Sequence, residues 1–93
     1  MDDPRLTYHR HLRRLATDDV AKVIYKDTDY GASWKARGGT GAFHVIARKW
    51  DRLEERVRLH NYDLFEAAAR DARDESLLDD IRDLRRYLML VEA

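Results

Sequence analysis

Apolar residues recur along this chain at the spacing of an α-helix. The clearest stripe lies between residues 41 and 58, where apolar side chains stand three, four and seven positions apart: Phe43, Ile46, Ala47, Trp50, Leu53 and Val57. This spacing predicts an amphipathic helix whose apolar stripe faces a core. Trp50, in the middle of the stripe, is expected to belong to that core.

The same periodicity predicts a helix before the central one. It covers Thr7 to about Lys26, and a cap at Thr17 could divide it into two helices with a joint near Ala16. Residues 1–6 are expected to be a disordered lead-in.

Two further helices are expected after the central one. A short helix covers residues 62–72 and is capped by Asn61. A longer helix opens at Asp74 or Ser76 and runs to about Val91. The short helix is expected to turn four residues inward: Leu64, Phe65, Ala68 and Ala69. No segment has the pattern of a strand, so the predicted fold is an all-α bundle of about four helices.

All four glycines fall between positions 31 and 41, in a basic segment predicted as a loop over residues 27–40. Thr40 is expected to cap the central helix, which would place the positive end of the helix dipole beside the loop. Such a combination can hold phosphate, although an ordinary solvated loop has the same pattern. The candidate substrate-binding residues are Tyr30, Gly31, Trp34, Lys35, Arg37 and Lys49.

Composition narrows the possible classes of protein. The 18 basic and 18 acidic side chains cancel, which argues against a general nucleic-acid coat. Without cysteine there is neither a disulfide nor a thiolate metal site, and no apolar run is long enough to span a membrane. The expected location is the cytoplasm. The 93 residues are expected to form a single domain, 1–93, whose small core would favour a homodimer.

Glu54 departs most from the helical pattern. At about 100° per residue its side chain projects to within roughly 40° of the centre of the apolar stripe, and Asp51 lies on the same side one turn away. A carboxylate aimed at a core is costly unless it is paired, protonated or bound to a metal. On the last helix, Asp80 leans toward the apolar stripe and Asp83 lies further round.

These acids would converge if the two helices pack antiparallel. Clustered carboxylates need a cation, and all-oxygen ligands favour Mg²⁺ or Mn²⁺. The candidate metal ligands are Asp51, Glu54, Asp80 and Asp83. The candidate catalytic residues are Glu54, Asp79 and Glu75, with either of the last two as a base for water.

The same acids can also be structural. In that alternative, Asp79 pairs with Arg82 and Asp83 with Arg86, while Asp51 pairs with Arg48 or Arg58. Glu54 would then form a buried ion pair with an arginine from another helix.

Three segments, DYGASW, ARKWDRLEE and ESLLDDIRDLRRYLML, resemble the nucleotide-modification-associated domain family of phages and bacteria, a family related to the all-α, MazG-like nucleotide pyrophosphohydrolases. The resemblance implies a helical bundle, commonly oligomeric, that binds Mg²⁺ through ExxE and ExxD motifs and releases pyrophosphate from a nucleoside triphosphate. These motifs would fall on Asp51 and Glu54, and on Asp80 and Asp83. Asp51 and Asp80 stand where the motifs have glutamate.

The leading hypothesis is therefore a Mg²⁺-dependent nucleoside triphosphate pyrophosphohydrolase, or a nucleotide-binding domain, linked to phage nucleotide metabolism. The alternative is a non-catalytic helical interaction or regulatory module, which predicts Glu54 in an arginine salt bridge and no response to magnesium. Nucleic-acid binding through the loop is a weaker third hypothesis, because the net charge is zero and the basic stretch is short.

Overall fold

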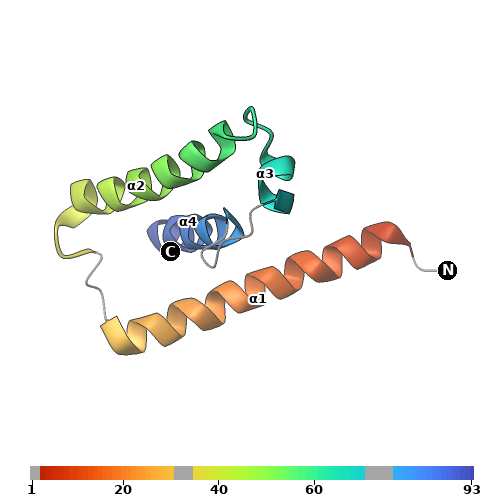
Figure 1. Cartoon of the computed structure of the whole chain (residues 1–93). Coiled ribbons are helices and arrows are strands. Elements are labelled where there is room, and N and C mark those ends of the chain that lie inside the picture. The colour runs from red at the N-terminus through yellow and green to blue at the C-terminus, as the bar shows by residue number, and fades with distance from the viewer. Residues whose placement is uncertain (1–2, 31–34, 71–76) are drawn as a thin grey trace. The chain divides into compact units, whose positions relative to one another are not determined.

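The structure is a computed structural model, and it describes residues 3–30 (the backbone alone for 27–30), 35–70 and 77–93. These residues form four α-helices, α1 to α4, and contain no strand, which confirms the predicted all-α class (Figure 1). The chain divides into two compact units, residues 1–33 and 34–93. None of the described helices is both long and apolar enough to cross a membrane.

The first unit contains α1, which runs without a break from Pro4 to Tyr30. It begins earlier than predicted because Asp3 caps it: its Oδ1 accepts a hydrogen bond from the backbone N–H of Arg5 at 2.9 Å. Proline suits the first helical position, where its missing N–H costs nothing. The side chain of Arg5 also hydrogen-bonds Asp3, and this contact lowers the pKa of that carboxyl below its usual range.

The predicted joint near Ala16 is absent, so that expectation is wrong. The Thr17 hydroxyl donates a hydrogen bond to the carbonyl oxygen of Arg13 at 3.0 Å, one turn back along the same helix. A threonine that bonds backward in this way lies within a continuous helix and does not cap a new one.

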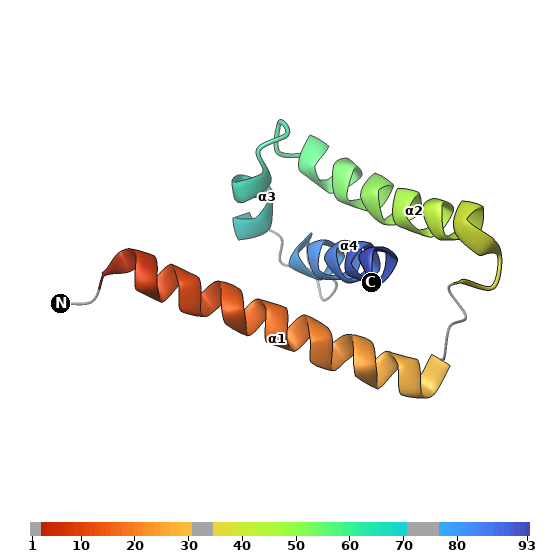
Figure 2. The same cartoon turned by 180° about the vertical axis from the view of Figure 1, so that it is seen from behind.

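The second unit consists of α2 (Gly38–Arg58), α3 (Leu64–Arg70) and α4 (Leu77–Glu92), and each of these helices contacts the other two. In Figures 1 and 2, α3 stands at the C-terminal end of α2 and beside the start of α4. The core of this unit is small. Its buried members come from all three helices: Leu53, Val57, Ala67 and Leu77. Ala68 and Ile81 pack against them.

The central helix begins at Gly38, so the prediction that Thr40 caps it is wrong. Arg37 occupies the cap position, and its side chain makes no capping hydrogen bond. Gly38 has a φ of +69°, a left-handed conformation that glycine adopts without steric cost, and this lets the chain turn into the helix before Thr40. A Cβ at Gly41 would lie 2.5 Å from the Cβ of Arg37, so this tight first turn requires glycine there.

The turn between α2 and α3 also differs from the prediction. Asp63, and not Asn61, caps α3, since its Oδ1 accepts a hydrogen bond from the backbone N–H of Glu66 at 3.0 Å. Asn61 and Tyr62 both have positive φ and form the reversal before the cap. Ala67 is the buried residue of α3, while Leu64 and Ala69, which were predicted to face inward, are exposed, and Phe65 is 87% exposed.

The buried side of α2 is rotated by roughly 50° from the centre of the predicted stripe. Ala42, Leu53 and Val57 are buried, whereas Phe43 and Trp50 are exposed, so the expectation that Trp50 belongs to the core is wrong. The rotation turns a row of basic residues, Lys49, Arg52 and Arg56, toward α4.

Candidate functional site

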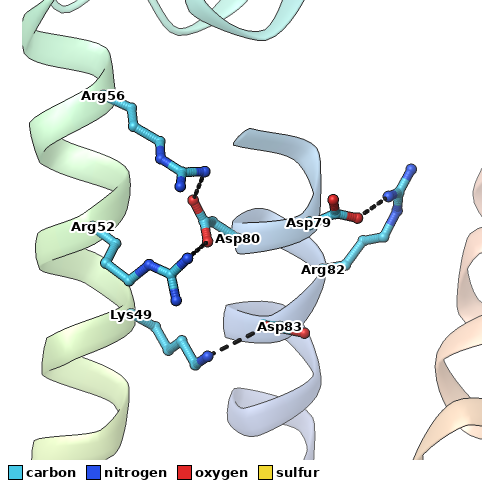
Figure 3. A network of polar contacts seen from close by, with 7 residues as sticks. All are labelled: Lys49, Arg52, Arg56, Asp79, Asp80, Arg82 and Asp83. Atoms are coloured by element: carbon cyan, nitrogen blue, oxygen red, sulfur yellow. Dashed lines mark hydrogen bonds and ion pairs between the residues drawn. The ribbon is translucent and has the colours of Figure 1, made fainter. Parts of the chain in front are cut away.

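Three basic residues of α2 lie one above another on the side that faces α4. Lys49, Arg52 and Arg56 are three and four positions apart, a spacing that places them on one face of a helix. Figure 3 shows their side chains reaching toward acidic residues on α4. The contact between the two helices is therefore charged as well as apolar.

Asp80 is the centre of this contact. The residue is 2% exposed, although it is an aspartate at the first turn of an α-helix. The Nη1 atom of Arg56 forms an ion pair with its Oδ2, and the Nη2 atom of Arg52 lies 3.6 Å from its Oδ1. No described residue donates a hydrogen bond of regular geometry to Oδ2, so Arg56 holds this oxygen by charge.

Burial makes this pairing necessary for the fold. An ionised carboxylate out of water is costly without a nearby opposite charge, and a guanidinium never loses its proton in proteins. The Arg56 side chain is only 14% exposed, so both members of the pair are shielded from solvent. The prediction that Asp80 leans toward the apolar side of its helix is confirmed.

The neighbouring acids of α4 are also paired. The Nζ atom of Lys49 donates to Oδ2 of Asp83 at 3.3 Å, and this pair is partly buried. Arg82 donates to Oδ1 of Asp79 at 2.8 Å, on the side of α4 away from α2, which confirms the predicted pairing between these two residues (Figure 3). Asp83 binds Lys49 of another helix rather than Arg86, its predicted local partner, because Lys49 lies on the face of α2 turned to α4.

The four candidate metal ligands are not brought together. Asp51 and Glu54 are exposed on α2, whereas Asp80 and Asp83 face the basic row. Within residues 3–30, 35–70 and 77–93, no group of three or more acidic or histidine side chains is placed to hold a metal ion. In this arrangement the residues do not fit a Mg²⁺ or Mn²⁺ centre, since Arg52, Arg56 and Lys49 provide the positive charge that a cation would bring.

Glu54 does not point into the core, so the prediction made from its place in the stripe is wrong. The rotation of α2 carries it out to solvent beside Trp50. The buried ion pair with an arginine of another helix, expected for Glu54 in the structural alternative, is formed by Asp80 instead. Of the other two candidate catalytic residues, Asp79 pairs with Arg82, and Glu75 lies outside the described residues.

The candidate substrate-binding residues are divided. Gly31 and Trp34 lie outside the described residues, as does the side chain of Tyr30. Lys49 is engaged with Asp83. Lys35 and Arg37 lie just before the start of α2. Lys35, Gly38 and Gly39 line a surface pocket of about 460 Å³, and its other walls are apolar residues of α2 and of the end of α4.

The pairing of Asp80 with Arg52 and Arg56 was not predicted from the sequence. A signal was present: with Lys49 they form a basic row spaced like one helix face, and Asp80 and Asp83 have matching spacing on α4. Matching rows of opposite charge on two helices predict pairing between them.

A comparison of the chain with protein-family models, curated proteins and solved structures finds no match.

Proposed function

We propose that this chain is a non-catalytic helical interaction module that self-associates. One observation carries the proposal: the buried carboxylate of Asp80 is paired with Arg56 and Arg52. Of the four acids that a metal-dependent enzyme would use, this is the most deeply buried, and here it joins two helices. The role supported for the row is to fix how α2 packs on α4.

Exposed apolar side chains supply the second half of the proposal. The unit of residues 34–93 has a small core, yet it exposes several large apolar side chains, with Phe43, Trp50 and Phe65 among them. A domain of this size gains much of its stability from any further burial, and an exposed apolar patch is typical of a surface that binds another protein. A homodimer is the simplest way to provide that burial.

The test combines a binding measurement with an activity measurement. We expect the melting temperature of the full chain to be unchanged by Mg²⁺, because a ligand that binds only the folded state would raise it. We also expect no pyrophosphate release from a panel of ribo- and deoxyribonucleoside triphosphates, with or without Mg²⁺. Magnesium-dependent release of pyrophosphate would refute the non-catalytic proposal.

The second candidate is the activity that the resemblance implies, a MazG-like nucleoside triphosphate pyrophosphohydrolase or nucleotide-binding domain. The observation that favours it is the pocket at the start of α2, where Lys35, Gly38 and Gly39 lie together. A basic side chain beside backbone N–H groups at a helix N-terminus suits a phosphate group. The same panel tests this candidate, since nucleotide binding without turnover would raise the melting temperature when nucleotide is added.

A further inference from the structure

The side of α2 that faces away from Lys49, Arg52 and Arg56 carries an apolar row, which we call the outer strip: Phe43, Ala47 and Trp50. These residues are four and three positions apart, so they lie along one line of the helix. Phe43 is 66% exposed and Trp50 is 52% exposed, and each ring also lines a surface hollow beside α4. Ala47, between the two large rings, has a small side chain, so a second helix can approach closely there.

Charges beside the outer strip are separated along the helix. Its N-terminal half contains His44 and Arg48 and no acidic residue, and Arg37 stands at the cap position before it. Its C-terminal half presents exposed Asp51, Glu54 and Glu55, with exposed Arg58 one turn after Glu54. One end of the outer strip is therefore basic, and the other carries a net negative charge.

The start of α2 also lacks the negative charge that would complement its dipole. No acidic residue lies in its first turn, and the side chain of Arg37 makes no capping hydrogen bond. A carboxylate brought to this end from outside would interact favourably with the dipole and with the guanidinium of Arg37.

We infer that two copies of this chain pair through their outer strips, with the two α2 helices antiparallel about a twofold axis near Ile46 and Ala47. In this register Phe43 of each copy faces Trp50 of the other. Glu54 and Glu55 of each copy reach the N-terminus of α2 in the other, beside its Arg37. Every contact occurs twice, as a twofold interface requires. The inference rests on the proposed function and specifies its surface.

The outer strip combines apolar rings, a small central residue and separated charges. An antiparallel copy satisfies all three features, whereas a parallel copy would place Glu54 against Glu54.

Sedimentation analysis of the full chain, from low micromolar to several hundred micromolar, tests the pairing. We expect a concentration-dependent change from the 11.0 kDa monomer to a dimer of twice that mass. Phe43→Asp and Trp50→Glu should each weaken the dimer by more than about tenfold, because each places a charge in an apolar contact. Leu59→Glu, a change at another exposed apolar residue, is the matched control and should leave the dimer intact.

A charge exchange tests the orientation without relying on loss of binding. Variant one carries Glu54→Lys and Glu55→Lys, and variant two carries Arg37→Glu. Each alone should dimerise more weakly than the wild type. A mixture should form a heterodimer about as tight as the wild type, because both ends of an antiparallel pair then join opposite charges. Circular dichroism confirms that each variant keeps its helices.

The outcomes separate this inference from the proposed function. A dimer unaffected by Phe43→Asp and Trp50→Glu would overturn the pairing through the outer strips and leave self-association in place. A wild-type chain that stays monomeric throughout would overturn both the pairing and the self-association. Failure of the mixture to restore the dimer would overturn the antiparallel orientation. These results would leave the non-catalytic assignment in place, since that assignment falls only if pyrophosphate is released.

Discussion

The two edges of the contact between α2 and α4 differ in chemistry. One edge carries Lys49, Arg52 and Arg56, which pair with acids of α4, while the other carries Phe43 and Trp50, which are more than half exposed and line surface hollows beside α4. Charge inside the contact fixes which side of α2 meets α4, because Asp80 must reach a guanidinium. Phe43 and Trp50 are the residues of the predicted apolar stripe that this rotation leaves exposed.

Two of the acids on which the functional prediction depended lie in different surroundings. Asp80 is buried and paired, whereas Glu54 is exposed at the acidic end of the outer strip. Removing the charge should therefore destabilise the fold strongly at Asp80 and hardly at all at Glu54.

The largest expected effect is that of Asp80→Asn. It removes the charge that Arg56 neutralises inside the contact, and breaking one side of a buried pair costs about 3 kcal/mol. Glu54→Gln is the matched control and should change the free energy of unfolding by less than about 0.5 kcal/mol. Urea unfolding followed by circular dichroism measures both, on protein dilute enough to be monomeric. Equal effects of the two substitutions would refute the contrast between the two sides.

A smaller effect is expected for Leu53→Ala. Leu53 belongs to the small core with Val57, Ala67 and Leu77, and truncation leaves a cavity among them. The cost should be about 2 kcal/mol, at the low end for leucine, because so small a unit can partly collapse around the gap. Leu59→Ala, at an exposed leucine just after α2, should cost less than about 0.5 kcal/mol in the same unfolding experiment. A larger loss at Leu59 than at Leu53 would show that the buried side of α2 is wrongly assigned.

The sequence was sufficient for the class of fold and for most helices. Apolar spacing predicts α2 and α4 closely, because long amphipathic stripes have few alternative structures. Helix starts were harder to predict. Thr17 and Asn61 can both cap a helix, yet Thr17 lies inside α1 and Asp63 caps α3, because the backbone conformation decides which side chain reaches a free N–H.

The candidate site depended on helix rotation, and periodicity leaves that rotation open by tens of degrees. A stripe that spans a wide arc can bury either edge. For α2 the choice depends on Asp80, which lies 24 positions beyond Arg56 in the chain and meets it only in the folded unit. Local pattern therefore placed Asp80 correctly on its own helix, yet placed Glu54 on the wrong side of α2.

The smallest expected effect concerns the exposed end of the basic row. Lys49 and Asp83 are 23% and 33% exposed, so water and salt screen their attraction. Lys49→Met should lower the free energy of unfolding by only about 0.5 kcal/mol at low salt, and the difference from the wild type should disappear at about 1 M salt. Arg48→Met, one position away on the exposed side, is the control and should show no such difference in dilute protein. A loss of stability in Lys49→Met that persists in high salt would contradict this expectation. It would mean that the whole basic row, and not Arg56 alone, is shielded from solvent, so that the difference between the two sides of α2 extends along the full length of the helix.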